Sequence, residues 1–553
     1  TYYLGDGSVP VDQDENRGAY SYQGEDGSEE HRTYVNEDTP DKGTIYVKDG
    51  NAPEVVPPTT DNSDNGTVVP TPTDNDTQST DASGNNTENS STSETTTENT
   101  ITVMEDVKKT EKTDGTEGND VKIVVEGVNV DTSTQTDPPA GVPADAKEDK
   151  TIIKVGEGAD VDLTVKGSNL TTGGNGIDIG VNLKDDDENK ETNVDLTLDN
   201  TKINLTEKDN TAGIVARDNS TVDVTLKGEN TIDGKEALED AAKEAEEAKK
   251  EGTSSPNRNV EGIRVGGNGV CDDSSGEGAS LTIKGDENSE QGSLKIDHTY
   301  TGMVISNGSD VTLTDNADVD INNTDAGSTT QGGRGIVQRG DLAIEDNSSL
   351  TIDTVHRGVH KIDNDQGGLR YDNNGHGIDS TAGITVTGDS TLEIKETEGS
   401  AIYGGTGSSL TVEDSTLDID SKIRGIDYQN DAGNITFENS EVDISGNGMG
   451  ISVAPGGGTN ITFDNSTGSV SAQNGTAIYG PEEKGNGDLT FTNGSDVTLN
   501  ANYGIQAGFN NVEISGQSKV VSNTVANGMI FRGGTSGATK LHITGNSLYD
   551  LNM

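Results

Sequence analysis

The stretch from Gly377 to Met529 decides the fold, because a small residue stands directly before an aliphatic residue or Met seven times within it. The gaps between successive pairs are 24, 24, 25, 27, 27 and 24 residues. A fixed period in this range is typical of solenoids, in which one unit cannot bury its apolar face without its neighbours. The pairs are Gly377-Ile378, Ala401-Ile402, Gly425-Ile426, Gly450-Ile451, Ala477-Ile478, Gly504-Ile505 and Gly528-Met529.

Most of these gaps also contain two strand-like triplets separated by a polar turn, as in Leu410-Thr411-Val412 and Leu417-Asp418-Ile419. In each triplet the two aliphatic residues point one way and the central polar residue points the other way. Units stacked at about 4.8 Å would therefore form continuous inward columns of aliphatic side chains. The sequence predicts an all-β fold, a right-handed parallel β-helix with three short strands per coil and 24–27 residues in each regular coil.

The chain divides into three predicted parts. Residues 1–50 hold nearly half of the tyrosines and lack the small-aliphatic pairs, which indicates a small β module, incomplete at its start. Residues 51–100 consist mostly of Thr, Asn, Ser, Asp and Pro, so we expect a disordered linker. Residues 101–553 carry the β-helix. Because the chain begins at Thr1 and stops soon after a strand-like segment at 541–543, we expect it to be part of a longer polypeptide.

The coils before Gly377 are longer, with spacings of 37, 49, 40, 33 and 42 residues between pairs, and therefore leave room for insertions. One insertion, residues 235–251, lacks Gly and Pro and is rich in strong helix formers. It predicts a helix lying on the flank of the solenoid, either as a cover or as a docking helix for a partner. Its apolar stripe comprises Leu238, Ala241, Ala242, Ala245 and Ala248.

Composition excludes several classes of protein. The net charge of −60 repels nucleic acids and anionic membranes, and it attracts cations and basic partners. Only 3% of the 553 residues are aromatic and there is no Trp, which suits a thin tube filled with Ile, Val and Leu. The single cysteine, Cys271, permits neither an intrachain disulfide nor a Cys-based zinc site. No apolar run approaches the roughly 18–20 residues of a transmembrane helix.

The coil that ends at Gly377 is the richest in residue types that are rare elsewhere in the chain. A loop that bulges from a regular scaffold is a common place for ligand contact. We therefore expect ligand-binding residues in this coil, namely His360, Asp363, Asp365, Arg370, Tyr371 and His376.

Gly375-His376-Gly377 resembles the Gly-His-Gly motif of the polygalacturonase family, whose site also needs paired aspartates one coil earlier and Arg-x-Lys one coil later. Here the pair Asp272-Asp273 lies 104 residues before His376, which is several coils away. Lys422-Ile423-Arg424 lies about two coils later and in the reverse order. Two catalytic carboxylates must lie within about 5–10 Å of each other. A lyase that uses Ca²⁺ and an arginine base in this coil is also conceivable, so a polysaccharide-active enzyme is the alternative function.

A column of acidic residues is the second candidate site. Glu393, Asp418 and Asp443 occupy equivalent outward positions of three successive coils and should stack about 5 Å apart. Like charges placed opposite each other in a sheet are unfavourable. A bound Ca²⁺ would reverse the sign of that interaction, since carboxylate oxygens are its preferred ligands. The alternative is plain solvation and screening of the three side chains by salt.

Over about residues 120–553 the small-aliphatic pairs and the triplets resemble right-handed β-helical surface proteins of bacteria, in particular the autotransporter-passenger and pectin-lyase-like adhesin group. Proteins of this group are secreted and present their long sides to host cells, glycans or each other. The resemblance implies a non-catalytic adhesin or structural protein at the bacterial cell surface, with a host-cell, glycan or matrix ligand. Arg339-Gly340-Asp341 also matches the integrin-binding tripeptide, but it leads directly into a strand-like segment.

Overall fold

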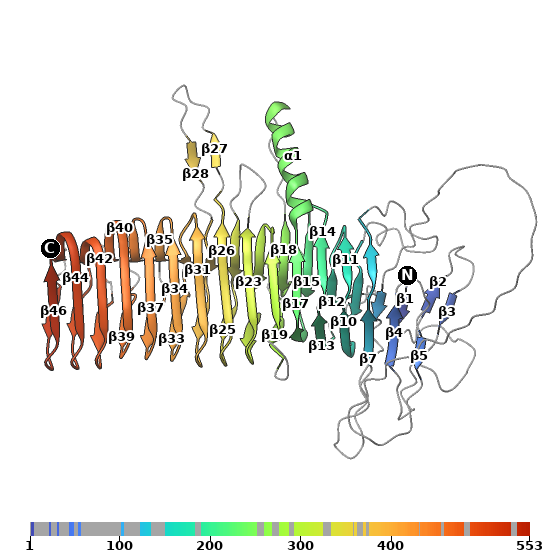
Figure 1. Ribbon diagram of the computed structural model, residues 1–553, viewed down its shortest axis with the longest axis horizontal. Helices are drawn as coiled ribbons and strands as arrows, with labels where there is room; N and C mark the ends of the chain where they lie inside the picture. The colour runs from blue at the N-terminus through green and yellow to red at the C-terminus, as the bar shows by residue number, and fades with distance from the viewer. Residues whose placement is uncertain are drawn as a thin grey trace, which may run out of the picture.

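The computed structural model describes most of the predicted β-helix and little of the segment before it. The described residues are 122–133, 150–182, 190–251, 259–267, 276–286, 292–324, 333–357, 375–430, 432–454, 458–480, 487–531 and 539–553, together with the backbone of eight short strands named below. They form a long tube of short strands, from which one helix and one small hairpin project (Figure 1).

Three faces make up the wall of the tube. Face 1 is a 16-stranded sheet, in which all the pairings except β4–β5 are parallel. Its strands are β4 Thr44–Lys48, β5 Glu54–Val56, β7 Lys122–Glu126, β10 Asp160–Lys166, β13 Thr192–Asp199, β16 Ser220–Lys227, β19 Ser280–Lys284, β22 Asp310–Thr314, β25 Asp341–Ile344, β30 Gly383–Val386, β33 Ser409–Glu413, β36 Ile435–Glu438, β39 Ile461–Asp464, β41 Leu489–Thr492, β43 Asn511–Ile514 and β45 Lys540–Ile543.

Faces 2 and 3 are the two parts of a 28-stranded sheet, joined because three long strands run from one face to the other. These strands are β40 Thr467–Tyr479, β42 Asp496–Ala507 and β44 Lys519–Phe531. The other strands of face 2 are β8 Asn129–Asp131, β11 Asn169–Thr172, β14 Lys202–Leu205, β17 Glu229–Asp233, β20 Ser293–Asp297, β23 Asp318–Thr324, β26 Ser349–Val355, β31 Thr391–Thr397, β34 Thr416–Ser421, β37 Glu441–Gly446 and β46 Leu548–Asn552.

Face 3 carries the small-aliphatic pairs of the sequence. Besides the ends of the three long strands, it consists of β1 Tyr2–Leu4, β6 Ile101–Val103, β9 Ile153–Gly156, β12 Ile177–Val181, β15 Thr211–Ala216, β18 Val260–Val265, β21 Thr301–Ile305, β24 Arg334–Gln338, β29 Ile378–Ser380, β32 Ile402–Gly404, β35 Arg424–Tyr428 and β38 Met449–Val453. Two further strands are β2 Ser21–Gln23, which pairs antiparallel with β1, and β3 Glu30–Arg32, which pairs antiparallel with β2.

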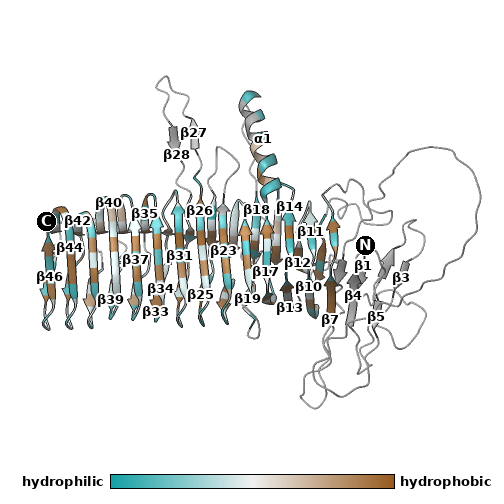
Figure 2. Ribbon diagram, viewed as in Figure 1, coloured by the Kyte–Doolittle hydropathy of each residue, from teal (hydrophilic) through white to brown (hydrophobic). Residues whose placement is uncertain are grey.

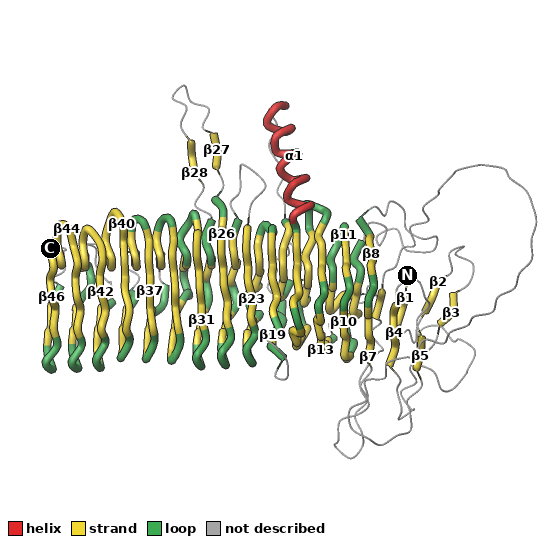
Figure 3. Tube along the Cα trace, in the orientation of Figure 1, coloured by secondary structure: helices red, strands yellow, loops and turns green. Residues whose placement is uncertain are grey.

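Each coil passes through face 1, face 2 and face 3 in that order (Figure 3). In most coils a turn or an insertion separates the strands, while β40, β42 and β44 continue from face 2 into face 3. Equivalent residues of successive coils are partners in parallel strands: Leu410 pairs with Ile435 on face 1, and Ile402 pairs with Ile426 on face 3. The predicted parallel β-helix with three short strands per coil is therefore confirmed.

One continuous core fills the tube, as the alternation in the triplets predicts. Aliphatic and polar residues alternate along the strands (Figure 2), and the aliphatic ones are buried in a single cluster that includes Ile402, Ile426 and Ile451. Three phenylalanines of face 1 stack along the axis inside it. The ring centroids of Phe437 and Phe463 lie 4.8 Å apart, and those of Phe463 and Phe491 lie 5.0 Å apart.

The small residue of each pair is required by close packing at the corner between faces 2 and 3. A Cβ on Gly377 would lie 2.5 Å from Cγ2 of Ile394 and 2.6 Å from the carbonyl oxygen of Ala401 in the next coil. A Cβ on Gly425 would meet Ile444 at 2.4 Å and the carbonyl oxygen of Gly450 at 2.6 Å. These contacts explain why only Gly or Ala precedes the aliphatic residue.

A ladder of buried serines holds the corner between faces 1 and 2. The backbone N–H of Ser415 donates to Oγ of Ser440 at 3.3 Å, and the N–H of Ser440 donates to Oγ of Ser466 at 3.1 Å. The residue before such a serine often has a positive φ, as Asp414 and Asn439 do, with values of 48° and 49°. Asp and Asn tolerate this backbone conformation better than most residues, so the predicted polar turn has a steric reason.

The strands of the first 56 residues continue the tube. β1 pairs in parallel with β6 of face 3, and β4 pairs in parallel with β7 of face 1. The rest of the predicted β module and almost all of the predicted linker at 51–100 lie outside the described residues, so the division into these two parts stays a prediction.

The predicted helix is confirmed as α1, Lys235–Glu251. Instead of lying along the flank, it projects from the tube at the corner between faces 2 and 3 (Figure 1). Ala237, Leu238 and Ala241 are buried at its base, whereas Ala242 of the predicted apolar stripe is exposed. No helix among the described residues has the length and hydrophobicity that a membrane crossing requires.

Candidate functional site on the outer side of face 3

The predicted ligand-binding coil forms a hairpin that projects from the tube at the same corner as α1 (Figure 1). Its strands are β27 Val359–Lys361 and β28 Leu369–Tyr371, which pair in antiparallel fashion. His360 is the partner of Arg370, and Val359 is the partner of Tyr371. The structure thus brings His360, Arg370 and Tyr371 into one hairpin. Asp363 and Asp365 lie outside the described residues.

His376 lies at the base of this hairpin on face 3, and its side chain is buried. Nδ1 of His376 accepts a hydrogen bond from the backbone N–H of Ser400 at 3.0 Å. The imidazole ring also stacks on Tyr403, with ring centroids 4.6 Å apart and an angle of 12° between the planes. With 3% of its surface exposed, His376 joins two coils and offers little surface to a ligand.

The predicted acidic column on face 2 exists in the expected register. Glu393 pairs with Asp418, and Asp418 pairs with Asp443 in the next coil. The protein supplies a cation to this column itself: the ammonium group of Lys395 bonds to Glu393 and lies 3.7 Å from Oδ2 of Asp418. Burial raises the pKa of the Asp418 carboxyl, and the positive charge of Lys395 opposes this shift.

The remaining member of the column, Asp443, accepts a hydrogen bond from Oγ of Ser469 at 2.7 Å. Within the part of the chain that the structure describes, no group of three or more His, Cys, Asp and Glu residues is arranged to hold a metal ion. The three carboxylates are therefore not a preformed three-ligand site, and Ca²⁺ binding along the column stays a prediction.

A regular arrangement of side chains appears on the outer side of face 3. The residues immediately before and after a small-aliphatic pair are three positions apart, and in several coils their side chains bond to each other across it. Asp178, Glu261, Arg264 and Asp427 are only 2–4% exposed. In one coil Asn175 donates to Asp178 at 2.9 Å, across Gly176-Ile177. In a second coil Nε and Nη2 of Arg264 donate to the carboxylate of Glu261 at 2.7 and 2.9 Å. In a third coil Nη1 of Arg424 donates to Asp427 at 2.5 Å. We call these positions the flanking pairs.

Further ion pairs tie the flanking pairs of successive coils together. Arg217 forms a bidentate ion pair with Asp178, in which Nε and Nη2 each donate to a carboxylate oxygen at 2.8 Å. Arg334 and Arg339 both bond to Asp379, at 3.0 and 3.3 Å. Five of the six arginines with described side chains lie on this side of the tube. These are Arg217, Arg264, Arg334, Arg339 and Arg424.

The outward-facing tyrosines of the described coils lie on the same side. Tyr403, Tyr479 and Tyr503 all belong to flanking pairs of face 3 and are partly exposed. By contrast, Tyr428 and the three stacked phenylalanines are buried inside the tube. The outer side of face 3 therefore combines the outward tyrosines with most of the described guanidinium groups of these coils.

The carboxylates of this surface are poorly placed for glycosidase chemistry. Asp379 is engaged by two arginines, and Asp427 receives hydrogen bonds from Arg424 and from Nε2 of Gln429 at 2.5 Å. These carboxylate oxygens already have partners within the protein, whereas the two carboxyl groups of a glycosidase must face the scissile bond. The arrangement suits the binding of a polar ligand better than acid–base catalysis.

The Arg339-Gly340-Asp341 tripeptide is built into the tube wall. Nη1 of Arg339 donates to the backbone oxygen of Asp379 at 2.9 Å, and Oδ1 of Asp341 accepts from the N–H of Gly383 at 3.1 Å. The integrin-binding interpretation expects a tripeptide displayed on a loop, which this geometry does not provide.

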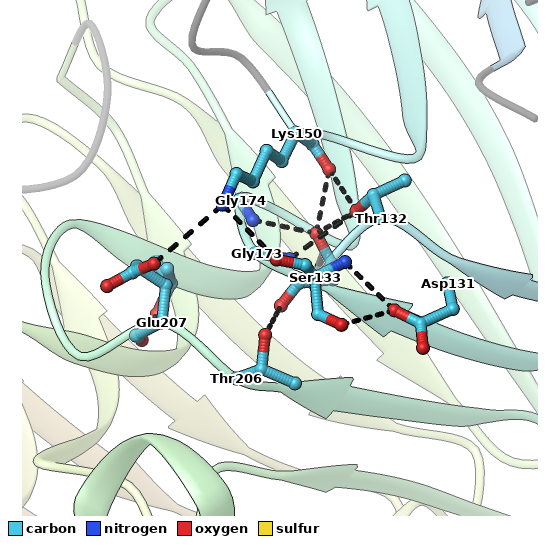
Figure 4. A network of polar contacts seen from close by, with 10 residues as sticks. Asp131, Thr132, Ser133, Lys150, Gly173, Gly174, Thr206 and Glu207 are labelled. Carbon is cyan, nitrogen blue, oxygen red and sulfur yellow. Dashed lines mark hydrogen bonds and ion pairs between the residues drawn. The ribbon is translucent and has the colours of Figure 1, made fainter. Parts of the chain in front are cut away.

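Two other polar features belong to the scaffold. Figure 4 shows the corner of the first coils, where the carbonyl oxygen of Lys150 accepts from Oγ1 of Thr132 at 2.6 Å and from Oγ1 of Thr172 at 3.0 Å. An open hollow of about 380 Å³ lies where the face 1 strands β13, β16, β19 and β22 begin, and polar residues line it, among them Glu191, Glu277 and Asp310. In the lining of the hollow, Oγ of Ser280 donates to Oδ2 of Asp310 at 2.7 Å.

Comparison with protein-family models, with curated proteins and with solved structures finds no match to this chain. Its fold is established by the strand pairing alone.

Sequence reasoning missed the flanking pairs, although their signal is present in the sequence. The residues on both sides of a small-aliphatic pair vary widely, as in Glu261-Gly262-Ile263-Arg264 and Ser400-Ala401-Ile402-Tyr403. Positions that vary next to an invariant structural element are where a repeat protein can present different chemistry. For the residue before a small-aliphatic pair, simple alternation along the strand predicts that the side chain points to the inside of the tube. The sequence therefore did not indicate that it contacts the residue after the pair.

Proposed function

We propose that this protein is an extracellular bacterial surface adhesin, in which a stiff β-helix presents binding residues along face 3 and on the projecting hairpin. It acts without catalysis on host-cell, glycan or matrix ligands. The proposal places the chain near the autotransporter-passenger and pectin-lyase-like adhesin group, on the strength of the coil pattern and the acidic, cysteine-poor composition.

The observation that carries this proposal is the uneven distribution of insertions, tyrosines and arginines over the sides of the tube. The corner between faces 1 and 2 has short turns in most coils, whereas α1 and the β27–β28 hairpin both leave the corner between faces 2 and 3. Tyr403, Tyr479, Tyr503 and five of the six arginines with described side chains lie on the side of face 3, which begins at that corner. A repeat scaffold that concentrates loops and unusual side chains on one side is typical of a binding protein.

Binding and catalysis are separated by one experiment on the full chain. The purified protein is applied to glycan arrays, matrix proteins and host-cell surfaces, and it is also incubated with pectate and polygalacturonate, with and without Ca²⁺. We expect saturable binding to at least one surface and no change in the polysaccharides. New reducing ends or unsaturated products would establish the enzyme alternative, and failure to bind any surface would overturn the adhesin proposal.

A further inference from the structure

The C-terminal half of face 3 carries a track of rings along the axis of the tube. Tyr403, Asp427, Ser452 and Tyr479 are partners in successive coils, so the first and last are three coils apart. At about 4.8 Å per coil this is a span of about 14 Å. In the next coil Tyr503 is the partner of Thr476, and it stands three residues before Gln506, the partner of Tyr479.

In the described coils from β7 onward, the tyrosines at outward strand positions lie on this face. Tyr479 and Tyr503 are partly exposed, whereas Phe437, Phe463 and Phe491 of face 1 are buried in the core. From β7 onward, no tyrosine or phenylalanine whose side chain the structure describes occupies an outward position of a strand on face 1 or face 2. Before that, Tyr46 of β4 has an outward register on face 1, as the partner of Val124. Only 3% of the residues in this chain are aromatic, and a buried ring would contribute more to the stability of the fold than an exposed one. The placement of Tyr479 and Tyr503 on the surface calls for a ligand that stacks on flat apolar faces.

The same track has almost no net charge. The flanking pairs from Ser400 to Gln506 contain one acid and one base, Asp427 and Arg424, and these two bond to each other. The whole chain has a net charge of −60, which repels anionic ligands. Gln506 adds a partly exposed, uncharged amide beside the rings, whereas Ser452 and Thr476 are each only 4% exposed. An apolar ring face next to neutral donors and acceptors matches the two surfaces of a sugar ring.

We infer that the outer side of face 3, from Tyr403 to Gln506, binds a neutral oligosaccharide that lies along the tube axis, with sugar rings stacked on Tyr479 and Tyr503. Tyr403 marks the far end of the track, where its ring is held by His376. This inference rests on the proposed adhesin function and names the chemical class of its ligand. Tyrosine is suited to this role because it combines a large apolar face with a polar tip.

The test uses the full chain and isothermal titration with cellohexaose, chitohexaose, mannohexaose and laminarihexaose, and with hexagalacturonate as the anionic comparison. We expect at least one neutral hexasaccharide to bind and the hexagalacturonate not to bind. Tyr479→Ala and Tyr503→Ala should each weaken that binding roughly tenfold, the loss expected for one stacking contact with a polar tip. Tyr479→Phe keeps the ring and should retain most of the affinity.

Thr462→Ala is the matched control, because Thr462 lies outward in β39 of face 1 and should leave the affinity unchanged. Thermal unfolding of each variant verifies that the tube is intact. If Tyr479→Ala and Tyr503→Ala bind the oligosaccharide as the unmodified protein does, the stacking track is wrong, while the adhesin proposal still stands. If no neutral hexasaccharide binds but cells or matrix proteins do, the ligand class is also wrong. If the protein binds no surface at all, both proposals fail together.

Discussion

At the scale of single residues, the small member of each pair is set by its distance from the next coil. The corner between faces 2 and 3 is so tight that a Cβ on Gly425 would lie 2.4 Å from a methyl group of Ile444. The two alanines at equivalent positions, Ala401 and Ala477, are buried without exposure, so a single methyl group is the largest group seen there.

Gly425→Val should therefore destabilise the tube. Two further methyl groups would be forced against Ile444 and the carbonyl oxygen of Gly450, and overpacking of this kind costs about 1–3 kcal/mol. The measurement is the midpoint of urea unfolding followed by circular dichroism. Gly448→Val in the neighbouring turn is the control, because the nearest atom to its added Cβ is the carbonyl oxygen of Ile423 at 3.4 Å. Equal midpoints for the two variants would contradict the packing explanation.

Asp418 makes stability depend on pH at one position of the acidic column. Because burial raises its pKa above the ordinary value of 3.8, the folded protein binds this proton more tightly than the unfolded chain does. The stabilising effect of protonation is fully present below pH 3.8 and is lost as the pH rises through the raised pKa. Asp418→Asn should therefore raise the unfolding temperature at neutral pH, and the difference from the unmodified protein should vanish in acid. An equal gain at every pH would show that titration of Asp418 is not the cause.

At the scale of elements, the serine ladder fastens each coil to the next at the corner between faces 1 and 2. Oγ of Ser440 accepts from the N–H of Ser415 and donates to the carbonyl oxygen of Glu438 at 2.6 Å. Both Ser415 and Ser440 are buried, so water cannot replace a lost partner. The ladder thus satisfies backbone groups that the strands leave unpaired where the chain turns.

Ser440→Ala should cost about 1–3 kcal/mol, because it leaves the buried N–H of Ser415 without an acceptor. Chemical denaturation at neutral pH measures the loss. Ser445→Ala on the outward side of β37 is the matched control and should change stability by less than about 0.5 kcal/mol. If the two serine variants are equally stable, the ladder contributes nothing and the corner is held by the strands alone.

The elements themselves were largely predictable from the sequence, since the period, the triplets and the helix-forming insertion are local patterns. The boundaries of α1 coincide with the predicted 235–251 for this reason. The direction of α1 was not predictable: it depends on how few residues at its base meet the tube, and Ala242 is exposed as a result. The flanking pairs also escaped prediction, because a contact such as Glu261 with Arg264 requires a bend that brings the two side chains together.

At the scale of the whole molecule, the proposed function depends on the different side chains that the faces of the tube present. In the described coils, face 2 carries the acidic column, while the arginine ion pairs and the outward tyrosines lie on face 3. A net charge of −60 keeps such a rod soluble but also strains it through self-repulsion, which is strongest where like charges stack in register.

Salt should therefore raise the unfolding temperature of the rod through screening, and bound calcium should raise it beyond the effect of screening. Raising NaCl from about 0.01 M to about 1 M shortens the screening length from about 30 Å to about 3 Å, so the unfolding temperature should rise steadily. If Ca²⁺ bridges the carboxylates of Glu393 and Asp418, CaCl₂ at the same ionic strength should raise the temperature further. That extra shift should grow in Lys395→Ala, because the ammonium group that competes for both carboxylates is gone, and it should shrink in Asp418→Asn. Thermal unfolding with CaCl₂ and with a chelator measures each case. An identical response of all three proteins to CaCl₂ and NaCl would leave only screening and remove the calcium site.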